Sequence, residues 1–357
     1  MSADKRNIRI IDIAQMSGVS AGTVDRVLHN RGKVSLDKQK RVEKALKELN
    51  YEPNIIARSL AMKRHYTIAA VIPYFEKGGY WDTVNVGIER AAKDLANFNV
   101  DVRYFYFSQY EVNSFTALIK KLEQADCDAA LIAALFDEPT VKLSAVLDEQ
   151  NIPYVFIDSN ISGQNNIAYF GADSYNSGAV AAKLMLYDIG EHTDIFIATL
   201  TTNNKKDSAQ TYIREQGFRD YLSNVGYKGV IHNVELSDDY TQIVRKITRL
   251  IEEKGELLGG IVFNSRIHEL ATILYRKMTT PHNIKLLGYD AIEKNIEALK
   301  RNEISFLLSQ RSDVQGYNGV KALSNLLLLR KKTPKINYMP IDILIRQNVE
   351  YYNNREL

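Results

Sequence analysis

The 357-residue sequence predicts an α/β protein with a small all-helical head at its N-terminus and a two-lobed α/β domain behind it. Three observations predict this architecture. The first 65 residues contain three short stretches of helical apolar spacing and 14 Lys and Arg against 7 Asp and Glu, a net charge of +7. From residue 66 on, short aliphatic runs alternate with amphipathic stretches, which favours parallel sheets covered by helices on both faces. Two such runs, separated near residue 170, indicate two lobes.

The composition is that of an ordinary globular protein, with 45% hydrophobic and 25% charged residues. Cys127 is the only cysteine, which excludes an internal disulfide framework and any multi-cysteine metal site. The N-terminus lacks the apolar core of a secretory signal, and the aliphatic run 326–329 is too short to span a bilayer. We therefore expect a cytoplasmic protein with no membrane partner.

The charge is unevenly distributed, because residues 66–357 carry 32 Lys and Arg against 36 Asp and Glu, a net charge of −4. A basic head on a slightly acidic body indicates that the head binds a polyanion such as nucleic acid. The alternative is a solvated helical face, to which five cations would contribute: Lys38, Lys40, Arg41, Lys44 and Lys47.

The head has the spacing of a helix-turn-helix. A first helix ends at Gly18, which can adopt the positive φ of a tight turn, and Ser20 is a good N-cap for a second helix over 21–28. A third helix begins at the cap Ser35. The apolar positions that we expect to face inward are Ile10, Ile13, Ala14 and Met16, then Val24, Val27 and Leu28, then Val42, Ala45, Leu46 and Leu49. A three-helix bundle with no role in DNA binding is the alternative.

The segment that follows, 53–65, predicts a linker with one short helix over 55–62. Pro53 suits the first turn of a helix, and so short a helix is marginal in water unless something supports it. Ala57 and Leu60 are apolar and lie beside cations, so they could wedge into a minor-groove step.

The body is expected to hold strands and helices in alternation. The predicted strands are 67–73, 101–107, 129–134, 154–158, 194–199, 229–234, 259–263 and 284–287. The predicted helices are 83–96, 115–124, 140–150, 175–188, 208–223, 239–254 and 268–277. Ligands of open α/β sheets bind beyond the carboxyl ends of the strands, so the residues there are the candidates for a ligand site.

Those candidates share a chemistry, since carboxylates, amides and one arginine would hydrogen-bond hydroxyl pairs while an aromatic ring covers C–H patches. They would suit a polyhydroxylated ligand, although each alone could be a satisfied strand-end cap. The residues are Tyr80, Trp81, Asp158, Asn160, Arg214, Asn264, Asp290 and Gln310.

Enzymatic motifs are scarce, because the sequence has no GxGxxG, P-loop or HExxH pattern and its six histidines are scattered. Asp158 and Asp290 could in principle form a glycosidase pair, but in this fold they are better interpreted as hydroxyl acceptors. We expect no catalytic residues, no metal ligands and no cofactor. The rival to a regulator is a soluble sugar-binding receptor or a carbohydrate-active enzyme with an interaction head.

The head and linker resemble one known family. The segments "IRIIDIAQMSGVSAGTVDRVLHNRGKVS" and "KRVEKALKELNYEPNIIARSLA" are similar to the DNA-binding head and hinge of the LacI family of bacterial transcription regulators. The resemblance implies a homodimer or tetramer on a near-palindromic double-stranded operator, with a hinge leucine, here Leu60, kinking the minor groove. The DNA-binding residues it implies are Ser20, Ala21, Gly22, Thr23, Arg26, Asn30, Asn54, Ala57 and Leu60. Ala21, Gly22 and Asp25 depart from the family pattern, which leaves more of the specificity to Arg26, Thr23 and the contacts of the hinge.

The body extends this resemblance to the effector domain of the same family, which shares its fold with periplasmic binding proteins. The matching segments are "QTYIREQGFRDYL", "GIVFNSRIHELA", "KLLGYDAI", "LLSQRSDVQGYNG" and "MPIDILIRQNVEYY". The resemblance implies a head at 1–52, a hinge at 53–65 and an effector domain at 66–357. Its first lobe would span about 66–170 and 305–335, and its second about 171–304 and 336–357.

The function that follows is a ligand-responsive repressor that senses a sugar or sugar derivative between its lobes and changes operator affinity through the hinge. Arg266 also departs from the family pattern. With Arg214 it would favour a sugar acid or a phosphorylated sugar, unless the two arginines pair with Asp290 and Asp158.

Overall fold

The computed structural model describes residues 8–28, 32, 34–49, 51, 64–200, 209–236, 245–250, 252, 257–277 and 284–352. The chain divides into two compact units, Met1–Met62 and Lys63–Leu357. Across these described ranges, no helix has the length and apolar character needed to cross a membrane.

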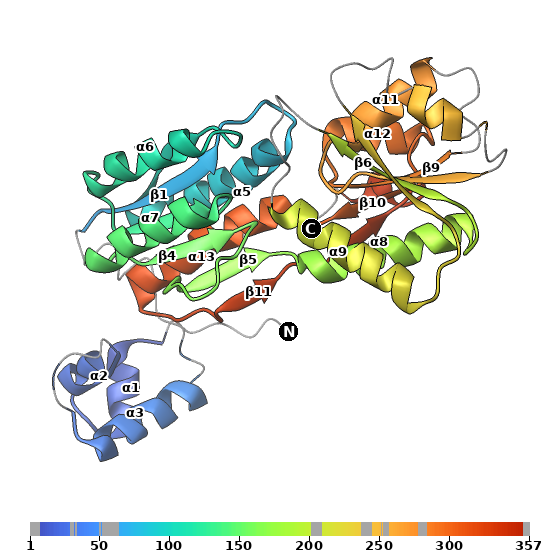
Figure 1. The fold of residues 1–357 in the computed structure, drawn as a ribbon. Helices are drawn as coiled ribbons and strands as arrows, with labels where there is room; N and C mark the ends of the chain where they lie inside the picture. The colour runs from blue at the N-terminus through green and yellow to red at the C-terminus, as the bar shows by residue number, and fades with distance from the viewer. Residues whose placement is uncertain are drawn as a thin grey trace. The chain divides into compact units, whose positions relative to one another are not determined.

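The described part of the first unit consists of the helices α1 (Ile10–Ser17), α2 (Ala21–Leu28) and α3 (Leu36–Glu48), drawn in blue in Figure 1. Gly18 ends α1 in the left-handed conformation, with φ at 64°, and its N–H donates to the carbonyl of Ala14. The turn between α1 and α2 is therefore the one that the sequence predicted.

Each helix of this unit contributes one fully buried aliphatic side chain to a shared core: Ile13, Val24 and Val42. Val27, Leu28, Leu46 and Leu49 pack against that core from partly buried positions. The expectation that Met16 faces inward is wrong, because its side chain is 48% exposed.

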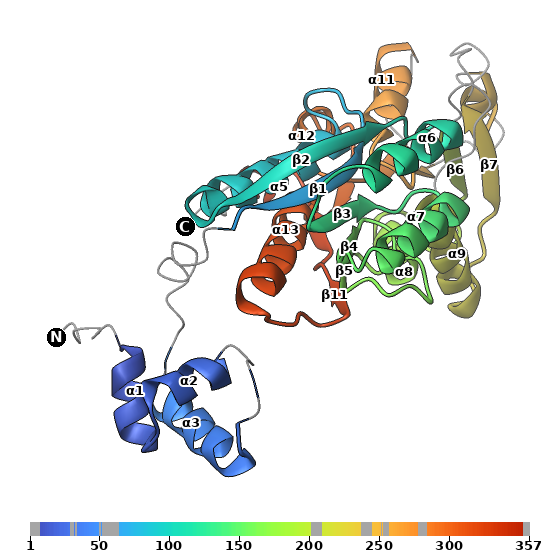
Figure 2. The same cartoon turned by 90° about the vertical axis from the view of Figure 1, so that its left-hand side faces the viewer.

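The second unit contains two sheets in its described residues. In the first sheet, all neighbouring strands are parallel and lie in the order β11–β5–β4–β3–β1–β2. Their bounds are β1 Tyr66–Pro73, β2 Val100–Phe107, β3 Ala129–Ala133, β4 Tyr154–Ile157, β5 Ala168–Gly171 and β11 Ile336–Tyr338. Helices α5 (Tyr80–Leu95) and α13 (Ser312–Leu329) cover one face, and α6 (Val112–Glu123) and α7 (Asp137–Glu149) cover the other (Figures 1 and 2).

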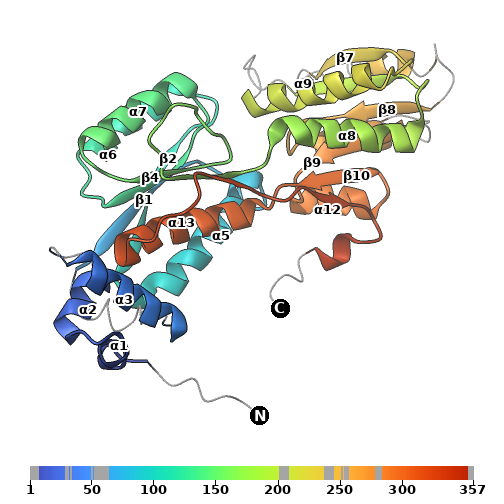
Figure 3. The same ribbon diagram turned by 90° about the horizontal axis from the view of Figure 1, so that it is seen from below.

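The second sheet repeats this plan in the order β12–β10–β9–β8–β6–β7, with β12 as an antiparallel edge strand. Its strands are β6 Ile195–Leu200, β7 Ile231–Leu236, β8 Leu258–Ile261, β9 Ile284–Tyr289, β10 Phe306–Ser309 and β12 Asp342–Leu344. Helices α8 (Ser174–Ile189) and α9 (Ala209–Asn224) lie together on one face (Figure 3). The other face is covered by α11 (Ile267–Lys277) and α12 (Glu293–Lys300).

The aliphatic runs form strands because helices bury both faces of each sheet. Along β6, Phe196 packs into the core on the side of α11 and α12, while Ile195 and Ile197 pack into the core on the side of α8 and α9. This alternation is the two-residue period of a strand. The apolar runs therefore mark eight of the strands correctly, although the predicted strand ranges include none of β5, β10, β11 and β12.

The chain passes between the two sheets three times in its described residues: after β5, between β10 and α13, and between β11 and β12. This corrects the expected lobe segments. The first lobe was expected to include 305–335, but β10 at 306–309 belongs to the second sheet. The second lobe was expected to begin again at 336, but β11 at 336–338 belongs to the first sheet.

Two helix pairs cross closely at glycines. A Cβ on Gly87 of α5 would lie 1.8 Å from the carbonyl oxygen of Asp313 at the start of α13. In the other lobe, a Cβ on Gly178 of α8 would lie 1.9 Å from the carbonyl oxygen of Arg214 on α9. Only glycine allows these backbones to approach so closely, and the second crossing packs α8 directly against α9 at Arg214.

The predicted helix 239–254 lies partly outside the described residues, of which 245–250 are helical. Most of the predicted linker, 53–63, also lies outside them.

Candidate functional site

The N-terminal end of α2 forms the exposed surface of the first unit that the sequence assigned to DNA. Ser20, Ala21 and Gly22 are exposed there, Thr23 is half-buried, and Arg26 is exposed in the last turn of the helix. Ser20 Oγ accepts a hydrogen bond of 3.2 Å from the Thr23 N–H, which confirms Ser20 as the cap of α2. The Ser20 and Thr23 hydroxyls lie 2.9 Å apart.

Four of the predicted DNA-binding residues, Asn30, Asn54, Ala57 and Leu60, lie outside the described residues. The cations predicted on α3 are exposed, and two of them pair within the helix: Arg41 with Asp37 at 3.2 Å and Lys44 with Glu48 at 3.8 Å. Exposed pairs of this kind contribute little to stability, so these cations can exchange partners at small cost.

The second unit holds a buried polar cluster at the carboxyl ends of its strands. Asp158 follows β4, Asp290 follows β9, Gln310 follows β10, and Arg214 projects from α9. Their exposures are only 4%, 5%, 4% and 3%. Charged side chains are almost never buried this deeply unless they are paired, so the contacts among these four decide what the site can do.

Arg214 lies at the centre of the cluster. Its Nη1 donates to the carbonyl of Phe263 at 2.8 Å, and its Nη2 donates to Gln310 Oε1 at 3.1 Å and to Gln210 Oε1 at 3.2 Å. The guanidinium lies 4.5 Å from the centre of the Tyr289 ring. Nε is buried without a hydrogen-bond partner.

Two carboxylates flank the guanidinium, one from each lobe. Gln310 Nε2 donates to Asp290 Oδ1 at 3.0 Å, and burial raises the pKa of Asp290 to about 6 against the lowering effect of Arg214. The Tyr80 hydroxyl donates to Asp158 Oδ1 at 2.5 Å. Burial also raises the pKa of Asp158, while Tyr80 and Arg214 act in the opposite direction.

Both aspartates have a left-handed backbone, with φ at 66° for Asp158 and 68° for Asp290. Aspartate tolerates this conformation better than most residues, but it is still uncommon outside glycine. Backbones of this kind concentrate at ligand sites, where the surrounding structure holds them in place.

Two glutamines that the sequence analysis did not identify join the lobes. Gln210, at the start of α9, donates to the backbone carbonyl of Asp158. Gln315 of α13 is fully buried; its Oε1 accepts from the Asp158 N–H at 3.1 Å, and its Nε2 donates to the Gln310 carbonyl at 3.0 Å. The one available signal was that Gln210 lies one helical turn before Arg214.

The remaining predicted residues are less closely associated with the cluster. Trp81 is buried in the first turn of α5, where its Nε1 donates to Gln109 Oε1 at 3.3 Å and its ring contacts Tyr80 edge-on. The expected helix start at 83 was late by three residues, so Tyr80 and Trp81 belong to the helix. Asn160 is exposed, unlike the rest of the predicted set.

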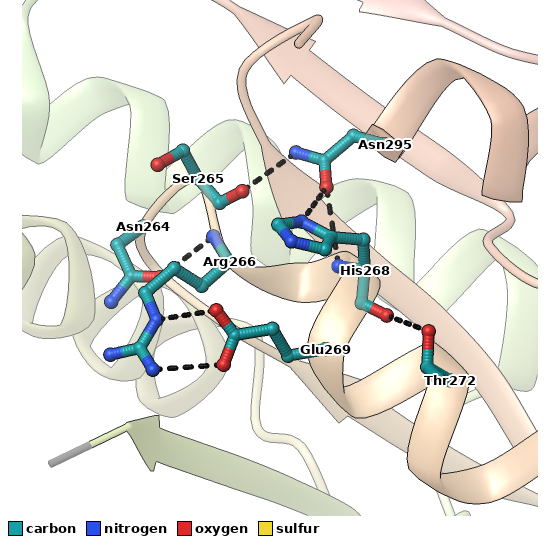
Figure 4. A network of polar contacts seen from close by, with 7 residues as sticks. All are labelled: Asn264, Ser265, Arg266, His268, Glu269, Thr272 and Asn295. Carbon is teal, nitrogen blue, oxygen red and sulfur yellow. Dashed lines mark hydrogen bonds and ion pairs between the residues drawn. The ribbon is translucent and has the colours of Figure 1, made fainter. Parts of the chain in front are cut away.

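The loop after β8 contains the other predicted polar residue. Asn264 is half-buried, and its Oδ1 accepts from the Arg266 N–H at 3.0 Å. Arg266 forms a two-pronged ion pair with Glu269, at 2.7 and 2.8 Å (Figure 4). The sequence left open a pairing of Arg266 with Asp290 or Asp158, and the structure pairs it with Glu269 instead.

The cluster has the chemistry of a hydrogen-bonding site. A small cavity beside it is lined by Ala172, Ser177, Arg214, Tyr289, Leu308, Ser309, Gln310 and Ile341. In the part of the chain that the structure describes, no group of three or more His, Cys, Asp or Glu side chains could hold a metal ion. Carboxylates, amides, one guanidinium and tyrosine rings are suited to a polar organic ligand.

Comparison with known proteins agrees with this division of the chain. A model of bacterial regulatory proteins of the lacI family matches residues 9–54, and a periplasmic binding protein domain model matches residues 68–332. The HTH-type transcriptional regulator RegA of Clostridium saccharobutylicum is 42% identical over 338 residues, covering 83% of this chain and 93% of RegA. The sucrose operon repressor of Streptococcus mutans is 25% identical over 96% of this chain and 99% of its own length.

Among solved structures, one described as a LacI transcriptional regulator from Bacteroides fragilis superimposes with a TM-score of 0.74 and 29% identity. The match covers 81% of this chain and 100% of that one.

Proposed function

The chain belongs to the lacI family of bacterial regulatory proteins, and we propose that it represses transcription by binding operator DNA in a manner that a small-molecule effector controls. The observation that carries this proposal is a single chain with two components. A capped helix-turn-helix lies in its first unit, and a buried polar cluster in the second unit draws on both lobes.

The first unit is suited to DNA because α2 exposes small residues at its start and one arginine in its last turn. Ala21 and Gly22 allow the end of α2 to approach base edges closely, and Arg26 can make a two-pronged contact with guanine. Cations on α3 would neutralise phosphates. A homodimer or tetramer on a near-palindromic operator is the assembly that we propose, by analogy with the family.

The second unit is suited to an uncharged polyhydroxylated effector such as a neutral sugar. Arg214 is held by three uncharged acceptors and flanked by the carboxylates of Asp158 and Asp290. Arg266 is paired with Glu269. In the described part of the site, carboxylates therefore balance the arginines, and no excess positive charge is left to bind an anion. This favours a neutral sugar over a sugar acid or a phosphorylated sugar.

Effector and operator would be coupled through the lobes. Gln210 and Gln315 already connect the strand ends of both lobes, so a ligand that replaces any of these contacts would change the angle between them. A ligand that weakens operator binding must itself bind more weakly to the operator complex, because the coupling is reciprocal.

Two measurements test the proposal. A thermal-shift panel of neutral sugars, sugar acids, phosphorylated sugars and nucleobases should identify a neutral sugar, since a ligand of the folded state raises the melting temperature. Retention of palindromic genomic fragments should then fall steeply with salt and change when that sugar is added. Failure to retain any fragment at low ionic strength, with and without metabolites, would contradict the proposal. Turnover of a sugar would favour a carbohydrate-active enzyme instead.

A further inference from the structure

Asn295, on α12, is a fully buried side chain that forms five hydrogen-bonding contacts. Its Nδ2 lies 2.9 Å from each of three backbone carbonyl oxygens, those of Ser265, Tyr289 and Asp290. Its Oδ1 accepts from the His268 backbone N–H at 3.2 Å and from His268 Nδ1 at 2.8 Å (Figure 4). One amide thus uses both its donor and its acceptor sides.

The orientation of this amide follows from its partners. Backbone carbonyls can only accept, so the group that faces three of them must be the NH2 group. A backbone N–H can only donate, so the opposite atom must be the oxygen. Rotation of the amide by half a turn would place its oxygen against three carbonyl oxygens. An aspartate would do the same with one of its two oxygens, so the contacts require asparagine at this position.

The three carbonyls belong to the two strand ends that supply effector-site residues. The hydrogen bonds from Asn295 to the carbonyls of Tyr289 and Asp290 hold the backbone at the point where Asp290 adopts its left-handed conformation. The carbonyl of Ser265 lies in the loop where Asn264 accepts from the Arg266 N–H. The acceptor side of Asn295 holds the start of α11 at His268.

We propose that Asn295 is a positioning residue of the effector site, which joins the ends of β8 and β9 so that Asn264 and Asp290 keep their binding geometry. Its complete burial leaves it no surface with which to contact an effector, so it acts through the backbone alone. This inference rests on the proposed function of the cluster as a sugar site.

The test uses the full chain with two substitutions. Asn295→Asp keeps the shape and the acceptor for His268 but turns a second oxygen toward the three carbonyls, and Asn295→Ala removes all five contacts. For the neutral sugar selected by the thermal-shift panel, we expect both variants to bind at least about tenfold more weakly by titration calorimetry. Affinities within twofold of the wild type would overturn the inference.

A matched control separates positioning from general stability. Asn166 is also a buried asparagine, donating to the Ala168 carbonyl at 3.1 Å and accepting from Lys335, but it lies at the amino end of β5, away from the strand ends that carry Asp158 and Asp290. Asn166→Ala should lower the melting temperature as Asn295→Ala does, yet keep the sugar affinity within twofold. An equal loss of affinity in Asn166→Ala would mean that instability alone explains the effect.

A measurement without a sugar distinguishes this inference from the proposed function. Hydrogen exchange of the free protein should show faster exchange at the amides of Arg266 and His268 in Asn295→Ala, by about tenfold relative to the wild type, and no such change in Asn166→Ala. Should wild type bind no sugar, the proposed function fails, and unchanged exchange at these amides would then overturn the positioning role. If the Asn295 variants do not fold, the half-buried His268→Ala should weaken sugar binding two- to fivefold, and an unchanged affinity there would count against the role.

Discussion

Asp158 and Asp290 occupy equivalent positions in the two sheets of the effector domain. Asp158 follows β4, the fourth strand counted from the edge strand β2, and Asp290 follows β9, the fourth strand counted from the edge strand β7. Both adopt a left-handed backbone, with φ at 66° and 68°. Each N–H donates to the carbonyl of a residue on the next strand, Phe170 for Asp158 and Leu308 for Asp290. The two lobes thus present one carboxylate each, with Arg214 electrostatically coupled to both.

Arg214→Lys should disable the effector site, because a point-charge ammonium cannot span the Phe263 carbonyl, Gln210 and Gln310 at once. We expect sugar affinity to fall at least tenfold and the free energy of unfolding to fall by about 2 kcal/mol, the value of one or two hydrogen bonds to a charged group. Calorimetric titration and chemical unfolding would measure the two effects.

The control for this substitution is Arg219→Lys, on the same helix, where Arg219 is half-buried and pairs with Glu215 at 2.8 Å. That change should leave sugar affinity unaltered. A similar loss in both variants would contradict the central role of Arg214.

Asp290→Asn should change how stability depends on pH. Burial raises the pKa of Asp290 to about 6 in the folded protein, above its value in the unfolded chain. Between about pH 4 and pH 6 the folded state therefore binds more protons, so this group lowers the free energy of unfolding as pH rises through that window. Above pH 6 the ionised Asp290 lowers the free energy of unfolding by about 3 kcal/mol in all, because its pKa in the folded protein is about two units above that in the unfolded chain.

The variant is accordingly expected to gain stability relative to the wild type above pH 6 and little below pH 4, while losing sugar affinity. Unfolding curves at several pH values would measure the difference in unfolding free energy between the variant and the wild type. A constant difference across the window would contradict the assignment.

Arg26→Ala should weaken operator binding by about 1–3 kcal/mol, or five- to 150-fold, and relax the preference for guanine at one position of each half-site. Arg26 is exposed on α2 and contributes nothing to the core of the head, so the fold and the sugar affinity should persist. Competition binding with operator variants would measure both effects. Lys183→Ala makes the same charge change at an exposed position of α8 and should alter neither the operator affinity nor the preference for guanine.

Gly87→Ala should destabilise the effector domain, because the new Cβ would lie 1.8 Å from the Asp313 carbonyl oxygen where α5 and α13 cross. Separation of the helices should cost about 3 kcal/mol of unfolding free energy. Val86→Ala, on the exposed side of the same helix, should cost far less. Equal melting temperatures for the two variants would show that the crossing tolerates a methyl group.

Most of the fold and the centre of the site could be predicted from the sequence, because parallel strands buried on both faces are aliphatic runs and ligand groups follow their ends. Asp158, Asp290 and Gln310 were found in this way, whereas Arg214, on α9, was identified by the family resemblance of its segment; the structure brings the four together. Asn160 was included by the same rule but is exposed.

Helical positions were the weak point of the prediction. Gln315 and Asn295 were missed because a single polar residue in a helix has no sequence signal that distinguishes a buried hydrogen bond from a solvated face, and for Gln210 the spacing from Arg214 was the one signal. β5 was missed because it is only four residues long and ends in glycine. Trp81 was placed in a loop because the helix start at Tyr80, preceded by Gly79, was not recognised.

The threefold passage of the chain between the sheets has a consequence for synthesis on the ribosome. The sheet that begins with β1 is covered by α13 about 240 residues later and completed by β11 about 260 residues later. The lobe that starts first must therefore wait, with an open edge and one face covered by α5 alone, until nearly the whole chain has left the exit tunnel. The core that the structure describes for the helical head lies within residues 8–51, so the head can fold long before that point. Nascent chains would thus carry a DNA-binding module before they carry the sensor that governs it.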